Sequence, residues 1–379
     1  MIYVDNAATT KLDPEAFEVM KPYMLDYYGN ASQPYSFSRK TKQALKDSRI
    51  TIAKCINAEP DEIYFTSGGT ESDNWAIKGF GSLSVPRNII TSMIEHHAVL
   101  NSCKTQISLG ASVNYLHVDN SGIVSIAELE EALLNVKQHG GQCDNTLVSV
   151  MLANNEIGTI EPICELSKIV HKYGATVHTD AVQAVGHIPI DIRENEVDML
   201  SASAHKFNGP KGIGFLYVRS GIKLRSHNTG GGQEFGMRAG TENVAAIVGM
   251  AVALENNCKK LDDEKNHLLA LEERLLSELR LSGLDFVRNG GSNHLPGNIS
   301  LSFKNAEGEL LLHRLDLMGI CVSTGSACDS NNTQISHVIE AIDVPEEYAK
   351  GTIRVSLGKE NDEKDIDEIA VALAKILNV

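Results

Sequence analysis

Apolar and polar positions follow two different periods along the first two-thirds of the chain. Short apolar runs such as residues 63–66 are bounded by glycine and polar residues, which is typical of buried strands. Longer stretches place apolar residues three or four positions apart, as Phe17, Met20 and Met24 do after Asp13. Because Asp13 is followed by proline, this pattern predicts a helix with Asp13 as its N-cap.

Strands and helices then alternate in order. We predict strands at residues 63–66, 146–152, 197–201 and 213–218, and one that begins at Thr176. A helix that is opened by Pro162 and closed by Gly174 lies between two of these strands, and Ser125 with Glu128 forms a predicted capping box for another helix. This alternation predicts an α/β fold with a mostly parallel sheet that is covered by helices on both faces.

The pattern changes near residue 256. A long charged helix is predicted at residues 262–281, followed by fewer and more mixed elements and a final amphipathic helix at residues 365–377. A chain of 379 residues also exceeds what one small core holds. We therefore predict a large domain of residues 14–256 and a smaller α+β domain of residues 257–379 that also includes residues 1–13.

Composition narrows the classes of function. The chain has 34 Lys and Arg against 49 Asp and Glu, a formal charge of −15, so it lacks the basic stripe that a nucleic-acid partner requires. It shows neither a basic and apolar leader nor an apolar run of membrane-spanning length, which predicts a cytoplasmic protein without a membrane partner. Seven cysteines, irregularly spaced, do not resemble a disulfide framework, and we expect most of them to be reduced and buried.

A glycine-rich loop follows the first of these strands. Residues 66–72 read Thr-Ser-Gly-Gly-Thr-Glu-Ser and lead into a helix. Glycines let the backbone approach an anion, and the first turn of a helix offers unpaired N–H groups, so this loop is a candidate phosphate site. The alternative interpretation is an ordinary strand-to-helix turn.

Two further strand ends carry candidate chemistry. Asp180 either caps a helix or pairs with the protonated nitrogen of a pyridine ring, which makes the ring an electron sink. Lys206 either reaches solvent from the edge of a loop or, desolvated at the end of an apolar strand, is a Schiff-base lysine. Their separation spans about one strand-to-strand step, so both can reach the sheet edge where α/β proteins bind ligands.

Cys328 lies among small and polar residues at positions 323–332, which is unusual because most thiols are buried. It is either a reactive thiol or a surface thiol without a function. Cys321, at the start of a short apolar run, is interpreted as structural. A zinc site built from Cys321, Cys328 and His337 has no recognised ligand spacing, and we expect no metal.

With these loops in order, the chain resembles the NifS/IscS-type cysteine desulfurases, which are class V aminotransferases among the fold-type I pyridoxal-phosphate (PLP) enzymes. The motifs that carry the resemblance are residues 5–10 (DNAATT), 66–74 (TSGGTESDN), 95–99 (EHHAV), 154–158 (NNEIG), 204–206 (AHK), 230–234 (GGGQE), 238–241 (RAGT), 325–328 (GSAC) and 353–356 (IRVS). They run nearly from end to end. The resemblance implies a fold-type I architecture, in which the smaller domain carries the cysteine loop.

The resemblance also implies a role for individual residues. Lys206 holds PLP and removes the Cα proton of the substrate, His96 stacks on the ring and shuttles the proton of the substrate thiol, and Cys328 receives the sulfur. Cofactor contacts are implied for Gly69, Thr70, His96, Asn155, Asp180, Gln183, Ser203, His205 and Lys206, and for Thr241, which reaches in from the second subunit of a homodimer. Asn155 and Arg354 are implied to bind the substrate carboxylate.

The implied reaction converts L-cysteine to L-alanine and leaves a persulfide on Cys328 for an acceptor protein, in iron–sulfur cluster assembly, cofactor synthesis or tRNA thiolation. Two other functions stay open. An aminotransferase, selenocysteine lyase or other lyase would share Lys206 and Asp180 but would not need Cys328. A sulfur carrier would have the docking of acceptor proteins as its main task. Release of alanine from cysteine with a dithiol separates the desulfurase from both.

Overall fold

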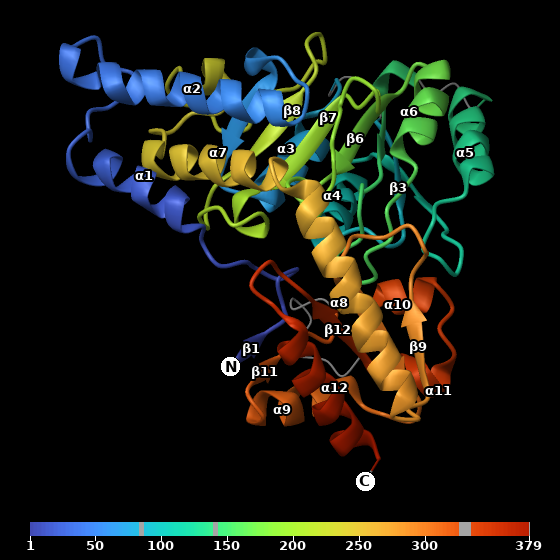
Figure 1. Cartoon of the computed structure of the whole chain (residues 1–379). Helices are drawn as coiled ribbons and strands as arrows, with labels where there is room; N and C mark the ends of the chain where they lie inside the picture. Colours follow the sequence, from blue (N-terminus) through green and yellow to red (C-terminus); the bar gives the residue numbers. More distant parts are fainter. Residues whose placement is uncertain (83–86, 139–142, 326–334, 379) are drawn as a thin grey trace.

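The computed structural model describes residues 1–82, 87–138, 143–325 and 335–378, which form two bodies joined by a long helix (Figure 1). The upper body in this view contains the large sheet. The lower body contains a small sheet together with both ends of the chain. Residues that begin the sequence therefore lie beside residues that end it.

A seven-stranded sheet forms the centre of the larger body, in the order β2-β8-β7-β6-β5-β3-β4. Its strands are β2 (Ile63–Thr66), β3 (Asn88–Ser92), β4 (Ser112–Leu116), β5 (Thr146–Ser149), β6 (Thr176–Asp180), β7 (Met199–Ser203) and β8 (Gly214–Val218). Among these seven strands, β8 alone runs opposite to the direction that the other six share. The sheet is mostly parallel, as predicted, and the carboxyl ends of β2, β7, β6, β5 and β3 meet at one edge.

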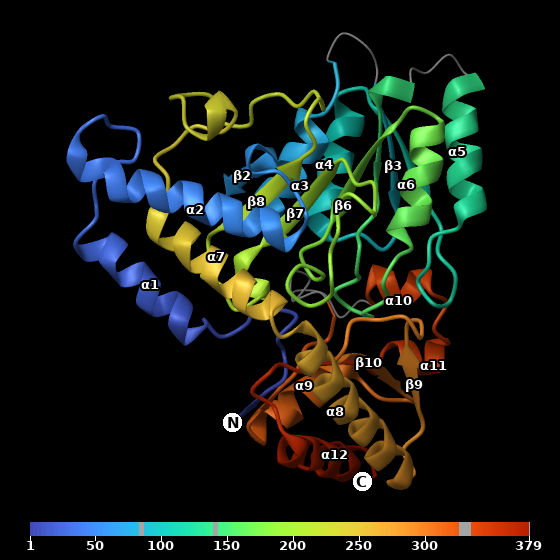
Figure 2. The ribbon, with the colours of Figure 1, turned by 45° about the horizontal axis from the view of Figure 1, so that its top comes forward.

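Helices cover both faces of this sheet because the sheet has an apolar cluster on each face. Alternate residues of a strand point to opposite faces, so Phe215 and Tyr217 enter one cluster while Leu216 and Val218 enter the other. The first cluster takes in α1 (Pro14–Leu25), α2 (Arg39–Cys55), α5 (Ile126–Gln138), α6 (Ile163–Lys172) and α7 (Val244–Cys258), and the second takes in α3 (Gly69–Gly79) and α4 (His97–Ser108). Figure 2 shows α1, α2 and α7 side by side over one side of the sheet.

The smaller body combines an antiparallel sheet, in the order β12-β10-β9, with a parallel pair formed by β1 and β11. Its elements are β1 (Ile2–Tyr3), α8 (Leu261–Leu281), β9 (Phe286–Asn289), β10 (Asn298–Phe303), α9 (Gly308–Leu317), β11 (Ile320–Cys321), α10 (His337–Ala341), α11 (Glu346–Ala349), β12 (Thr352–Ser356) and α12 (Glu363–Leu377). We propose that the two domains divide near residue 256. This division is supported by a separate apolar cluster that unites Ile2 and Val4 with residues from Leu268 onward.

In the described ranges, no helix combines the length and the apolar character that crossing a bilayer requires. The longest helix, α8, carries charged residues along its length.

Two local predictions need correction. The Ser125 hydroxyl accepts the N–H of Glu128 at 3.3 Å, but the Glu128 carboxylate bonds to the N–H of His117 instead of returning to Ser125, so half of the capping box forms. Strand β5 ends at Ser149 rather than at Leu152, although N–H groups beyond Ser149 still donate to carbonyl oxygens of β6. The first difference arises because the N–H of His117 offers the Glu128 carboxylate a competing hydrogen-bond partner.

The six described cysteines are free thiols, as predicted. Of these six, Cys103 is the one that is buried, and the other five are partly exposed, which corrects the expectation that most are buried. Each of the five lies within two residues of the end of a helix or strand, where the core gives way to the surface.

Gly214 of β8 connects the sheet to the glycine-rich loop. It pairs with Thr66 of β2 on one side and with Ser203 of β7 on the other. A Cβ atom at this position would lie 2.7 Å from the Cα atom of Gly68 and would also overlap the carbonyl oxygen of Ala202. The close approach of these backbones therefore requires glycine at position 214.

We expect Gly214→Ala to lower the free energy of unfolding by roughly 1–3 kcal/mol, because the added methyl group must push the backbone of the loop aside. Urea denaturation measures the change. Gly291→Ala is the control, since a Cβ atom there would meet Ser121 at an ordinary 3.4 Å. Equal stability of the two variants would contradict the prediction.

Candidate active site

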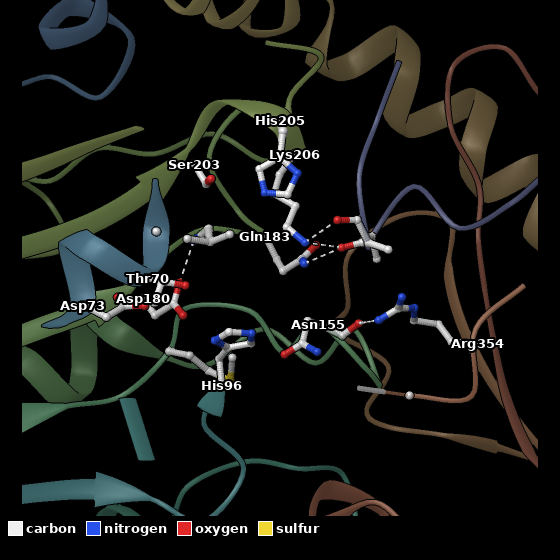
Figure 3. Close-up of a pocket in the computed structure, with 16 residues that line it drawn as sticks. Thr70, Asp73, His96, Asn155, Asp180, Gln183, Ser203, His205, Lys206 and Arg354 are labelled. Carbon is white, nitrogen blue, oxygen red and sulfur yellow. Dashed lines mark hydrogen bonds between the residues drawn. The ribbon is translucent and has the colours of Figure 1, made fainter. Parts of the chain in front are cut away.

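A cavity of about 290 Å³ lies at the edge of the large sheet where the carboxyl ends of the strands meet (Figure 3). The large body contributes Gly69, Thr70, Asp73, His96, Met151, Asn155, Asp180, Val182, Gln183, Ser203, His205 and Lys206 to its walls, and the facing side contributes Ala7, Ala8, Gly325 and Arg354. The structure thus brings together every predicted cofactor and substrate residue except Thr241. The position agrees with the rule that open α/β sheets bind ligands beyond the carboxyl ends of their strands.

Five strand ends supply the side chains of the large body. Strand β2 leads to Gly69 and Thr70, β3 to His96, β5 to Asn155, β6 to Asp180 and Gln183, and β7 to Ser203, His205 and Lys206. Each strand is a short buried run that ends in polar residues. The polar side chains of the candidate site therefore lie where the apolar runs of the strands end.

Lys206 lies one turn beyond β7 and points into the cavity rather than toward solvent. Its Nζ atom donates to the carbonyl oxygens of Ala7 and Ala8 at 2.6 and 2.9 Å. The Gln183 amide donates to the same Ala7 oxygen at 3.0 Å. The N-terminal segment thus holds the amine in place at the centre of the site (Figure 3), which the sequence alone did not indicate.

The glycine-rich loop forms a cradle at one end of the cavity. The φ angle of Gly68 is +149°, which favours glycine, and a Cβ atom on Gly69 would lie 2.5 Å from the Val182 side chain. Helix α3 begins at Gly69, so its first N–H groups lack intrahelical partners and are available to bind an anion. Burial, with Lys206 close by, lowers the pKa of His205 to about 4, so its imidazole is neutral beside this cradle.

Two buried acidic side chains line one end of the cavity. Asp73 and Asp180 are 1% and 4% exposed, and their oxygens lie within 4.8 Å of each other and of a ring nitrogen of His96. Burial raises the pKa of Asp73, an effect to which Asp180 adds, and burial also raises the pKa of Asp180. Among the described atoms, Asp73 Oδ1 has no hydrogen-bond partner. A protonated nitrogen placed here would relieve this accumulation of acidic groups.

Asp180 also accepts the N–H of Val182 at 2.9 Å, so it caps the local turn as well as facing the cavity. Asp73 belongs to the motif of residues 66–74, and the motif alone does not indicate its role. Its signal in the sequence was an acidic residue beside Trp75 on an otherwise buried helical face. A buried carboxyl in such a place indicates either a partner or a ligand.

His96 lies over the acidic group, at the start of α4. Its Nδ1 atom accepts the N–H of Ala98 at 3.1 Å, so the neutral ring carries its proton on Nε2. Burial lowers the pKa of His96, with Asp180 opposing and Lys206 reinforcing the shift. The ring is therefore mainly neutral at neutral pH and is able to take up a proton.

Arg354 of β12 forms the opposite end of the cavity. It is 3% exposed, and its two terminal nitrogens donate to Asp5 Oδ1 and to the carbonyl oxygen of Asn155, both at 2.7 Å. Among the described atoms, its Nε atom has no acceptor. Asp5 belongs to the motif of residues 5–10, but the sequence does not indicate its ion pair with Arg354. The two residues lie nearly a whole chain apart, so no local pattern connects them.

Two predicted site residues are not placed in the cavity. Cys328 lies outside the described residues. Thr241 lies on an exposed segment and does not line the cavity of its own chain. The other two residues of the zinc alternative are described. Cys321 is partly exposed at the end of β11, and the His337 ring bonds to the carbonyl oxygen of Glu95 at 3.1 Å.

The profile of the aminotransferase class-V family matches residues 2–369, and the chain belongs to this family. Within this family, two similar proteins of known name are cysteine desulfurases. The cysteine desulfurase IscS of Dictyoglomus turgidum is 48% identical over 379 residues, which cover 99% of this chain and 94% of the relative. The cysteine desulfurase IscS of Methanosarcina thermophila is 44% identical over 378 residues, covering 99% of this chain and 92% of the relative.

Solved structures give the same result. A NifS-like protein superposes with a TM-score of 0.90 at 38% identity and covers 100% of this chain and 99% of its own. SspA in complex with cysteine superposes with a TM-score of 0.82 at 36% identity and covers 94% of this chain and 99% of its own. The chain therefore has the predicted fold-type I architecture.

PLP is the cofactor of this family and of this chain, and the cavity fits it. The cradle at Gly69, which has no space for a side chain, suits the phosphate group. The buried Asp180 suits the protonated ring nitrogen. Lys206, held between these two places by backbone carbonyls, would bind the cofactor covalently.

Glu95, which accepts the N–H of the cavity residue Met151 at 2.9 Å, predicts a dependence of stability on pH. Burial raises the pKa of Glu95, which is 0% exposed, from 4.5 to about 8. The folded chain thus binds this proton more tightly than the unfolded chain does. Stability is fully present below about pH 4.5 and falls by up to about 1.4 kcal/mol per pH unit as the pH rises toward 8.

Glu95→Gln removes this titration, so its stability should fall less steeply than that of the parent between pH 5 and 8. Urea midpoints measured across this range with saturating cofactor test the prediction. Glu161→Gln is a second test of the same effect, because burial also raises the pKa of Glu161 to about 8 and neither glutamate lines the cavity. It should flatten the curve to a similar extent. Parallel curves for Glu95→Gln and the parent would refute the assignment.

Proposed function

We propose that the chain is a cysteine desulfurase in which Lys206 holds PLP and Cys328 takes the sulfur of L-cysteine. The observation that carries this proposal is the position of Gly325, which lines the cofactor cavity three residues before Cys328. Three residues span at most about 10 Å, so the chain itself keeps Cys328 near the cavity. A lyase or an aminotransferase would have no need of a thiol tethered there.

The substrate carboxylate is proposed to bind between Asn155 and Arg354. A guanidinium has five N–H donors in a planar fork that matches a carboxylate. Two of the Arg354 donors are engaged by Asp5 and the Asn155 carbonyl, which fixes the plane of the fork and leaves donors for a ligand. The acidic residues at the other end of the cavity would repel the same carboxylate, so the amino acid has one favoured orientation.

When bound, PLP supplies an electron sink for the electron pair left on the substrate after the Cα proton is removed. Lys206 is positioned to take this proton, because its amine lies at the centre of the cavity. The neutral His96 ring is positioned to accept the proton of the substrate thiol. The Cys328 thiolate then attacks the substrate sulfur, so that one S–S bond forms as the C–S bond breaks. The electron pair of the C–S bond stays on the substrate Cβ, which takes up a proton to become the methyl group of alanine. Overall, L-cysteine and the enzyme thiol give L-alanine and an enzyme persulfide, with atoms and electrons balanced.

The persulfide is proposed to pass to an acceptor protein. We also propose that the chain acts in the cytoplasm, which the free state of all six described thiols favours. An alternative in which docking is the main task predicts no catalytic release of alanine, and the test of Cys328 below distinguishes the two.

Cys328→Ser should still bind PLP and L-cysteine, but it should form neither persulfide nor catalytic alanine, because a serine hydroxyl stays protonated and is a poor nucleophile toward sulfur. Alanine release and mass mapping of the persulfide measure both effects. Cys321→Ser is the matched control. It alters a partly exposed thiol at the end of β11 and should keep most activity. Full activity of the Cys328→Ser variant would contradict the desulfurase mechanism.

We further propose a homodimer in which Thr241 completes the phosphate site of the partner. Thr241 follows an exposed segment that includes Phe235, which is 62% exposed at a φ of 58°. Arg238 in this segment pairs with Glu71 at 2.9 Å, and Glu71 accepts the N–H of Ser67. The segment is therefore tied to the outer side of the glycine-rich loop while Thr241 stays exposed.

Sedimentation should show a dimer at assay concentrations, and Thr241→Ala should weaken PLP binding while Thr241→Ser retains it, because the proposed contact is a hydroxyl hydrogen bond to phosphate. Absorbance titration with PLP measures the affinity. An active monomer, or equal affinity of all three chains, would rule out the shared site.

A further inference from the structure

The two ends of the segment that carries Cys328 meet at one buried carboxylate. Glu156, which follows Asn155 in the loop after β5, is 1% exposed. Its Oε2 atom accepts the hydroxyl of Ser336 at 2.6 Å. A Cβ atom built on Gly325 would lie 2.9 Å from the same oxygen and 3.7 Å from Cβ of Ser336. The chain therefore leaves at Gly325 and returns at Ser336 to the same point.

The Gly325 side is also tied to the substrate site. Ser323 exchanges two backbone hydrogen bonds with Arg354, at 3.1 and 2.6 Å, and its hydroxyl donates to the carbonyl oxygen of Gly325 at 3.1 Å. The φ angle of Gly325 is +108°, and Glu156 fills the space that a side chain would need there. Gly325 thus has a fixed place between Arg354 and Glu156.

The Ser336 side is tied to an apolar cluster. The Ser336 hydroxyl accepts the N–H of Val338 at 3.1 Å and so caps α10. Val338 packs in a buried cluster with Ile157, the residue after Glu156. Polar and apolar contacts of two consecutive residues therefore anchor the start of α10.

These contacts matter for sulfur transfer because of the lengths of chain involved. Cys328 is three residues from Gly325 but eight from Ser336. At about 3.3–3.6 Å per residue, the shorter arm sets the reach of the thiol, so a displacement of Gly325 moves the whole range that Cys328 can occupy.

We propose that Glu156 is a positioning residue that fixes Gly325 and Ser336 together and thereby sets the reach of Cys328 for sulfur transfer. This inference rests on the proposed desulfurase function. Glu156 does not line the cavity, in contrast to the neighbouring Asn155. It should therefore affect the transfer of sulfur and leave the steps that do not involve Cys328 unchanged.

The test compares two reactions of the holoenzyme. Exchange of the Cα hydrogen of L-alanine with D2O reports on Lys206 and the cofactor without any sulfur step. Single-turnover release of alanine from L-cysteine, with mass mapping of the persulfide, reports on transfer to Cys328. The variants are Glu156→Ala, Glu156→Gln, Ser336→Ala and the double variant Glu156→Ala with Ser336→Ala.

We expect Glu156→Ala and Ser336→Ala each to slow sulfur transfer at least roughly ten-fold, the effect of one lost hydrogen bond to a charged group. Cα exchange and the KM for cysteine should stay within about two-fold of the parent. Glu156→Gln should recover most of the rate, because its amide oxygen can still accept from Ser336. The double variant should be little slower than either single variant, since both lose the same contact.

Asp362→Ala is the control for the loss of a helix cap. Asp362 caps α12 by accepting the N–H of Asp365 at 3.0 Å, in the smaller body and remote from Glu156 in the sequence. It should leave both reactions unchanged. A slowed transfer in this variant would show that general loosening of the smaller body suffices, and would overturn the role given to Glu156.

Further outcomes would overturn either the inference about Glu156 or the proposed function on which it rests. Sulfur transfer within two-fold of the parent in Glu156→Ala and Ser336→Ala would overturn the inference, as would an equal fall in Cα exchange, which would mean that Glu156 acts through Asn155. If Glu156→Ala does not fold, Ser336→Ala and Glu156→Gln decide by the same criteria. A parent enzyme that releases no alanine would instead overturn the proposed function, and the inference with it.

Discussion

One buried guanidinium joins the three parts of the chain that meet at the active site. Arg354 comes from the small sheet, Asp5 from the N-terminal segment and Asn155 from a loop of the large sheet, and the two hydrogen bonds of Arg354 hold them together. Removing one partner of a buried ion pair typically costs about 3–5 kcal/mol. The same N-terminal segment supplies the Ala7 and Ala8 carbonyls that hold Lys206. The placement of the central lysine therefore depends on Arg354, at the far end of the cavity.

The charges of the cavity are arranged along one direction. Figure 3 shows Asp73 and Asp180 at one end, Arg354 at the other and Lys206 between them. In a site of low dielectric such fixed charges act strongly, because little water screens them. Under the proposed function, this arrangement would favour one orientation of the substrate carboxylate. Burial lowers the pKa of both His96 and His205, and Lys206 adds to this effect, while Asp180 opposes it at His96.

The parts of this site that could be predicted are those with a local signal. Apolar runs ending in Asp180 or Lys206 indicated the edge of a parallel sheet, and the topology confirmed it. The resemblance named the side chains around the cofactor, and the structure brings nearly all of them into one cavity. The contacts made by backbone carbonyls, by the Asp5–Arg354 pair and by Glu156 could not be predicted, because they join residues more than a hundred positions apart.

The pairing of β1 with β11 sets an order of events during synthesis. Asp5 and its partner Arg354 are separated by 349 positions. At roughly 5–20 residues per second, a ribosome therefore needs on the order of 20 to 70 s to make the second after the first. For most of this interval the large sheet can form while β1 has no strand to pair with, because β11 is complete only at Cys321. The contact that joins the N-terminal segment to the small sheet therefore forms only after the whole large sheet has been made.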